Sequence, residues 1–102
     1  MSYVKIGGLK FKVKEVVGLV DGDNGLLGEI NYTNQVIRLE KFNEPFHKDL
    51  VMLHEVMHGL ITLGINAELG SDEPFIRSLS HGLYALMRDN PKLFTDMIQR
   101  KP

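Results

Sequence analysis

The chain has 102 residues, a formal net charge of −1 and no cysteine. This length suffices for one small domain with a modest core, which we expect to span residues 1–102. The near-neutral charge argues against a nucleic-acid partner, and the lack of cysteine excludes disulfide bonds and thiolate metal ligands. Any metal site must therefore use histidine and carboxylate ligands.

No apolar run approaches the roughly 18 residues that a membrane-spanning helix needs, so we expect no membrane partner. Residues 1–14 are interrupted by lysines and by Gly7-Gly8, unlike a secretory signal peptide. We therefore expect a cytoplasmic protein that is a monomer or a small homo-oligomer.

The first third of the chain predicts β-strands. Residues 4–6 and 9–13 alternate apolar and charged side chains, which is the period of a half-buried strand. Gly7-Gly8 between them suits a two-residue hairpin turn. Residues 15–20 fit either a continuation of the strand or a short helix.

A second hairpin is expected next. Residues 26–31 and 35–39 are rich in apolar side chains, and Tyr32-Thr33-Asn34 between them has the composition of a turn. Residues 65–70 are expected to form a connecting loop much later in the chain.

Helices are expected from residue 43 onward. Residues 47–64 contain no proline and are apolar over most of the helix circumference, which is typical of a central, buried helix with Asn43 as its N-cap and Gly64 just past its end. Ser71-Asp72-Glu73-Pro74 opens a second helix, and Asn90-Pro91 ends it and opens a third. Because strands precede helices, the expected class is α+β: a small antiparallel sheet of about four strands followed by two or three helices.

The central helix carries His54-Glu55-Val56-Met57-His58, which matches the pattern H-E-x-x-H. Residues four apart lie on one helix face, so both imidazoles can point at one cation, with Glu55 beside it. Buried polar side chains need partners, because unpaired ones cost free energy. A metal ion supplies such a partner, and ordinary hydrogen bonds are the alternative.

The second helix has a polar stripe beside its apolar one, made by Glu73, Arg77, Ser80, His81 and Tyr84. If the two helices pack together, Glu73 comes near His54 and His58. Catalytic zinc takes three protein ligands and a water molecule. Asp72, His81 and Glu68 are the other candidates for the third ligand.

The motif resembles that of the zincin metallopeptidases, whose minimal arrangement is a short sheet, an H-E-x-x-H helix and a second helix. Over about residues 26–90 the chain looks like the compact gluzincins and the small phage-type or ImmA/IrrE-like metallopeptidases. The positions of the metzincin glycine and third histidine are Ile61 and Gly64, so that pattern fails. The gluzincin resemblance implies Zn²⁺ as the cofactor, with Glu73 as its third ligand.

One position departs from the gluzincin pattern. Many gluzincins place an acid four residues after the ligand glutamate, where it supports a ligand histidine. Here that residue is Arg77, which cannot accept a proton from imidazole. Another group, such as a backbone carbonyl, must then orient the histidines.

The resemblance implies a zinc-dependent metallopeptidase acting on a peptide or protein, with a metal-activated water and Glu55 as the general base. Candidate stabilisers of the transition state are His81, Tyr84, Arg77, His47 and Tyr32. The substrate is expected to add to an edge strand of the second hairpin. The alternative is a catalytically inactive, zinc-stabilised regulatory or interaction module, phage-borne in origin.

Overall fold

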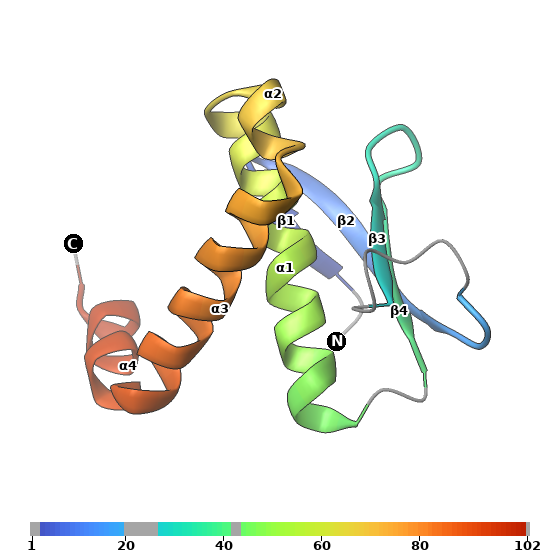
Figure 1. Ribbon diagram of the computed structural model, residues 1–102. Helices are drawn as coiled ribbons and strands as arrows, with labels where there is room; N and C mark the ends of the chain where they lie inside the picture. The colour runs from blue at the N-terminus through green and yellow to red at the C-terminus, as the bar shows by residue number, and fades with distance from the viewer. Residues whose placement is uncertain (1–2, 20–26, 42–43, 102) are drawn as a thin grey trace.

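The computed structural model describes residues 3–19, 27–41 and 44–101. Within these ranges the protein is α+β, as predicted, with a four-stranded sheet and, on one side of it, four helices, one more than the two or three expected (Figure 1). Of these helices, α1 alone packs on the sheet. The strands are β1 (Tyr3–Ile6), β2 (Leu9–Val16), β3 (Gly28–Asn31) and β4 (Val36–Glu40). The helices are α1 (Pro45–Gly64), α2 (Ala67–Gly70), α3 (Glu73–Asp89) and α4 (Pro91–Gln99).

The first predicted hairpin is confirmed. Ile6 pairs with Leu9, and the two residues between them, Gly7 and Gly8, have φ values of 57° and 83°. A hairpin turn with two left-handed positions favours glycine at both, because glycine lacks the Cβ that clashes there. β2 continues to Val16, so the strand reading of the following segment holds that far.

The sheet is mixed, and the expectation of a purely antiparallel sheet is wrong at one pairing. The strand order is β1-β2-β4-β3, with β2 and β4 parallel. The second hairpin therefore docks on β2 through its second strand. β4 contributes the buried residues Ile37 and Leu39, and the more apolar strand of a hairpin belongs in the interior of a sheet. This order leaves β3 at an edge.

The turn of the second hairpin is one residue longer than predicted. Residues 32–35 form it, and Gln35 adopts a left-handed φ of 53° instead of opening β4. The backbone N–H of Asn34 donates to the side-chain oxygen of Asn31 at 2.9 Å, which closes the turn on itself. Tyr32 is thereby placed at the end of the edge strand.

Helix α1 covers one face of the sheet. Its N-cap is Glu44, whose side chain accepts from the backbone N–H of His47, whereas Asn43, the predicted cap, lies outside the described residues. Gly64 is the last residue of the helix, not the first beyond it. The main core lies between this helix and the sheet; its buried residues are Ile6, Phe11, Ile37, Leu39 and Val51.

Edge strand β3 lies directly against α1 because Gly28 has no side chain. A Cβ built there would fall 2.4 Å from Cγ1 of Val51 and 3.3 Å from a carboxylate oxygen of Glu55. The first of these contacts is closer than packed atoms allow, and the second would require Glu55 to shift by a few tenths of an ångström. The glycine thus sets the spacing between β3 and the face of α1 that carries the motif.

Helix α2 occupies part of the segment that was predicted to be a loop. The side chain of Asn66 caps it by accepting from the backbone N–H of Leu69 at 2.7 Å. Its last residue, Gly70, packs so closely on α1 that an added Cβ would lie 2.0 Å from Oγ1 of Thr62. This contact holds the backbone of Gly70 against the second half of α1.

Helix α3 begins where predicted, with Asp72 as its N-cap, and runs back alongside α1 (Figure 1). A second core cluster lies between the two helices, with Met57, Ile61 and Ile76 buried at its centre. Leu86, which continues the apolar stripe of Ile76, Leu79 and Leu83 along α3, is nevertheless 47% exposed, because α3 diverges from α1 toward its end. Leu60 and Leu63 of α1 are exposed as well, so this helix is less enclosed than its composition suggested.

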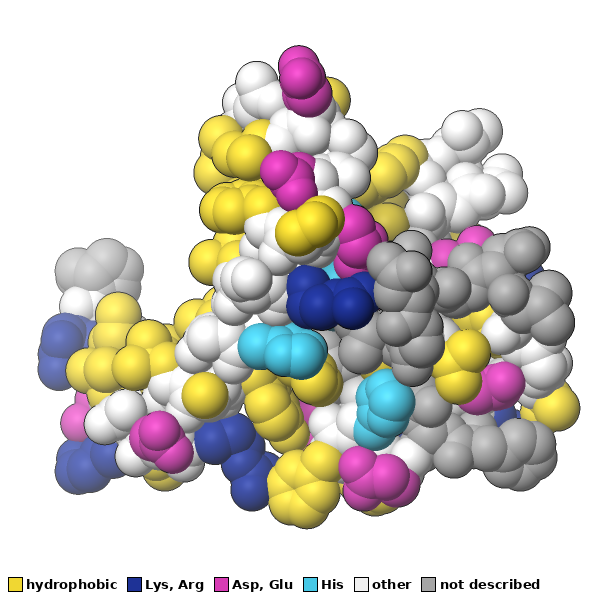
Figure 2. All heavy atoms as spheres, in the orientation of Figure 1, with side chains coloured by type: hydrophobic (Ala, Val, Ile, Leu, Met, Phe, Trp, Pro, Cys, Tyr) yellow, Lys and Arg dark blue, Asp and Glu magenta, His cyan; other side chains and the backbone are white. Residues whose placement is uncertain are grey.

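Helix α4 has no buried residue, and among the described elements it contacts α3 alone. Apolar side chains gather on its surface, where Leu93, Met97 and Ile98 are each more than half exposed (Figure 2). No helix in the described ranges is long and apolar enough to cross a membrane.

Candidate metal centre

The two histidines of the motif lie in the middle of α1 and face each other. His54 is fully buried and His58 is 8% exposed. Their ring centroids are 4.7 Å apart, and the two Nε2 atoms approach to 3.1 Å. The one-turn spacing therefore brings both imidazoles to a single point, as the motif predicts.

Glu73 reaches the same point from the first turn of α3. Its Oε1 lies 2.6 Å from Nε2 of His54, and its Oε2 lies 3.0 Å from Nε2 of His58. Pro74 and the Asp72 cap fix the start of this helix, so the carboxylate is presented from a defined position.

The other candidate ligands do not join this group. The side chain of Asp72 accepts the backbone N–H of Phe75 at 3.1 Å and so serves the helix end. His81 is exposed on α3, and Glu68 is exposed on α2. In the part of the chain that the structure describes, His54, His58 and Glu73 form the one group of three potential ligands, with ligand atoms within 4.8 Å of one another.

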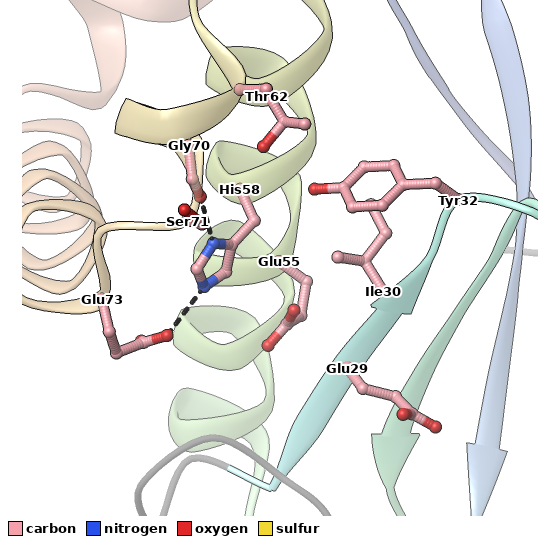
Figure 3. Close-up of a pocket in the computed structure, with 10 residues that line it drawn as sticks. Glu29, Ile30, Tyr32, Glu55, His58, Thr62, Gly70, Ser71 and Glu73 are labelled. Atoms are coloured by element: carbon pink, nitrogen blue, oxygen red, sulfur yellow. Dashed lines mark hydrogen bonds and ion pairs between the residues drawn. The ribbon is translucent and has the colours of Figure 1, made fainter.

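The tautomer of His58 follows from its second hydrogen bond. Its Nδ1 lies 2.8 Å from the backbone oxygen of Gly70 (Figure 3). A carbonyl oxygen only accepts, so Nδ1 carries the hydrogen. In neutral His58 the lone pair is then on Nε2, aimed at Glu73 and His54, which is the form that ligates a metal. Because Arg77 cannot accept a proton from a ligand histidine, we expected another group, such as a backbone carbonyl, to orient the ring. The carbonyl of Gly70 does so for His58.

The donor set fits zinc. Neutral Nε2 of His58 and the Oε2 of Glu73 are both acceptors, so their 3.0 Å approach requires a shared cation, either a proton or a metal ion. Two ligands of a tetrahedral zinc, each about 2.05 Å from it, lie about 3.3 Å apart. The separations of 3.0 and 3.1 Å at His58 are close to this spacing, whereas the 2.6 Å between Nε2 of His54 and Oε1 of Glu73 is that of a short hydrogen bond.

Glu55 lies beside the ligand group, not within it. Its side chain is 1% exposed and extends from α1 toward β3 (Figure 3). It lines a cavity of about 400 Å³ together with His58 and Glu73. A carboxylate in this place can act on a water molecule in the cavity without being a ligand itself.

Most of the remaining cavity wall comes from residues that the sequence did not single out. Glu29 and Ile30 of β3 form one side, and Thr62, Ala67, Gly70 and Ser71 form the other. The wall carries three glutamates and, among its described residues, no lysine or arginine; Glu29 pairs with Arg38. The local sequence signal for this side of the wall was Asn66, whose side chain caps α2 and helps to hold the backbone of Gly70 in place.

Of the five candidate stabilisers of the transition state, Tyr32 is the one that lines this cavity. Arg77 lies beside Glu73 on α3, with its Nη2 3.8 Å from Oε1. Tyr84 lies under the guanidinium of Arg88, at 5.9 Å, and its hydroxyl is buried. His81 is exposed, and His47 lies in the first turn of α1.

Comparison with known proteins adds no relative: no family model, no curated protein and no solved structure matches this chain.

Proposed function

We propose that this protein is a zinc-dependent metallopeptidase of the zincin type. The observation that carries the proposal is the convergence of His54, His58 and Glu73 on one point, beside a cavity that the buried Glu55 also lines. A buried acid in a cleft beside a group of potential metal ligands marks a candidate site for metal-assisted hydrolysis.

Each of these residues has a separate task. His54, His58 and Glu73 hold the ion, and Gly70 fixes the ring of His58 through its carbonyl oxygen. When bound, zinc supplies a Lewis acid that acidifies water and polarises a carbonyl group. Glu55 takes the proton from the attacking water and delivers it to the departing amine nitrogen.

The substrate is a peptide or protein that lies along edge strand β3. This strand ends the sheet, and its residues Glu29 and Ile30 line the cavity that holds Glu55. An extended peptide can pair with such an edge through main-chain hydrogen bonds, which positions its carbonyl groups beside the cavity. The cytoplasmic location and a monomeric or small oligomeric state belong to the same proposal.

The first test is metal content and hydrolysis in the same preparation. Protein purified without added metal should contain equimolar zinc by elemental analysis and should cleave some members of a pool of quenched fluorescent peptides. Glu55→Gln should keep the zinc and the fold but lose about 100-fold or more in hydrolysis, because the general base is gone.

Glu68→Gln is the matched control, since it makes the same change at an exposed acid on α2 outside the cavity. It should hydrolyse peptides like the wild type. Equal activity in wild type and Glu55→Gln would reject Glu55 as the base, and absence of zinc would reject the metal centre.

A second candidate function is a zinc-stabilised interaction module without activity. The exposed apolar surface of α4 favours it, because such surfaces on small proteins often mark sites of association. Zinc binding with no hydrolysis of any peptide in the pool would select this alternative.

A further inference from the structure

The face of the sheet that is turned away from the helices is basic. Helix α1 packs against the other face, which carries Phe11 and Ile37. Successive residues of a strand point to opposite faces and cross-strand partners share one, so the register assigns each strand residue to a face. The open face carries five exposed cationic side chains, which are Lys5, Lys10, Lys12, Lys14 and Arg38.

Like charges meet on this open face in direct register. Lys5 lies opposite Lys10, and Lys14 lies opposite Arg38. Such pairs destabilise a sheet. Lysines on an edge strand guard against aggregation, but β2 lies between β1 and β4, so that role does not account for the lysines of β2. A negatively charged ligand would relieve the repulsion.

The acids on the same face are already engaged. Glu29 forms an ion pair with Arg38. Glu40 accepts the backbone N–H groups of Gly18 and Leu19 at 3.0 and 3.2 Å. The four lysines form no ion pair with any residue that the structure describes. Their charge is therefore available to a ligand.

The lysines of β2 are regularly spaced. Lys10, Lys12 and Lys14 occupy every second position of the strand and are thus about 6.8 Å apart along it. A chain of phosphodiester groups is a polyanion whose charges repeat at a comparable distance. At the end of the row lies a cavity of about 300 Å³, where amide groups accompany the cations. Its lining residues are Lys14, Asn31, Asn34, Val36 and Arg38.

An aromatic ring lies beside the other end of the row. Tyr3 is 47% exposed, and the ammonium group of Lys10 lies 4.6 Å from the centroid of its ring. Proteins that hold single-stranded nucleic acid without sequence preference combine a basic track for the backbone with aromatic rings on which bases stack. The open face offers both components.

We propose that the open face of the sheet binds single-stranded nucleic acid, with phosphates along the lysines of β2 and a base on Tyr3. The net charge of −1, from which we expected no nucleic-acid partner, is a sum over the whole molecule and conceals this local excess. The major groove of a duplex admits a helix or a two-stranded ribbon, which is narrower than a four-stranded face. A membrane surface is disfavoured because the strands place no Leu, Ile, Met, Phe or Trp on this face.

The test is fluorescence anisotropy of a labelled thymidine oligonucleotide of about 15 nucleotides, titrated with the full chain at several salt concentrations. In Lys12→Gln/Lys14→Gln, affinity at low salt should fall by about 10-fold or more. The slope of log affinity against log salt should shrink by about 1.4, because each neutralised phosphate contributes about 0.7. Thermal unfolding should show a Tm no lower than that of the wild type, since the variant loses the repulsion between Lys14 and Arg38.

The matched control is Lys92→Gln/Lys101→Gln, which removes the same charge from exposed positions at the C-terminal end of the chain. It should bind like the wild type. Tyr3→Leu should weaken binding without changing the salt slope, because stacking releases no counterions.

Three results would overturn the proposal: no binding by the wild type at about 50 mM salt, an equal loss in both double variants, or an unchanged affinity in Lys12→Gln/Lys14→Gln. Equal or tighter binding of a duplex of the same length, or tighter binding of phosphatidylserine vesicles, would overturn the choice of a single strand. None of these measurements depends on peptide hydrolysis, so failure of the peptidase proposal would leave this one standing.

Discussion

At the scale of single residues, the candidate metal centre combines two histidines of α1 with one glutamate of α3. His54, Glu55 and His58 share one helix turn and were identified by their spacing. Glu73, at the start of α3, was one of several candidate third ligands and was selected by the resemblance to gluzincins. Tyr32 was one of five equivalent candidates, because its place at the cavity depends on the strand order of the sheet.

The imidazole of His58 should be required both for zinc binding and for the stability of the folded protein. In His58→Ala, zinc affinity should fall by orders of magnitude, and the free energy of unfolding should fall as well, because metal binding is coupled to folding. His81→Ala is the matched control, since that histidine is exposed on α3 away from the ligand group.

Zinc titration followed by thermal unfolding checks both variants. Zinc affinity equal to wild type in His58→Ala would remove His58 from the ligand set. Loss of zinc in His81→Ala would show that His81 belongs to the metal site, which contradicts the proposed ligand set.

At the scale of elements, seven of the eight helices and strands in the described ranges were expected, and most errors concern how these elements pack together. Hairpin patterns do not say which strand of a hairpin docks on the rest of the sheet, so the parallel pairing of β2 and β4 was missed. The four-residue α2 is too short to show a helical period. Leu86 continues the apolar periodicity of the core residues of α3 but is exposed. The sequence carries no local signal for the point at which α3 diverges from α1.

The close approach of β3 and α1 should depend on Gly28. In Gly28→Ala the new Cβ must displace Val51 or the strand, and such overpacking typically costs about 1–3 kcal/mol. Because the same Cβ would lie beside the Glu55 carboxylate, hydrolysis should fall as well. Urea unfolding monitored by circular dichroism, together with peptide turnover, measures both effects.

Gly82→Ala serves as the control for that experiment. No atom lies within 4 Å of a Cβ built at this position on α3, so the substitution should stabilise the protein by up to about 1 kcal/mol through helix propensity. A Gly28→Ala variant as stable and active as the wild type would show that β3 can move away from α1 at no cost.

At the scale of the whole molecule, the candidate metal centre joins the two parts of the fold. α1 packs on the sheet, α3 packs on α1, and the ligand group bridges the middle of α1 and the start of α3. Glu73 contacts both His54 and His58, and these contacts place polar groups in a small core. A bound cation would offset the free-energy cost of burying them.

Removal of the metal should therefore loosen the packing of α3 on α1. At free zinc about 100-fold above its Kd, the bound ion stabilises the folded state by about 2.7 kcal/mol. For a domain of this size we expect chelation to lower Tm by about 10 °C or more. Calorimetry of wild type and His58→Ala with and without chelator tests this, because the variant should show no such shift; an equal shift in both would place the zinc elsewhere.

Gly70 links helix docking to the protonation pattern of the centre. Its missing Cβ permits α2 to press on Thr62, and its carbonyl oxygen keeps the hydrogen of His58 on Nδ1. A carboxylate in that position would carry a charge that depends on pH, whereas a backbone carbonyl oxygen carries none. The direction of this imidazole is thus set by main-chain architecture and not by the charge of a further side chain, and it should persist for as long as α2 stays packed on α1.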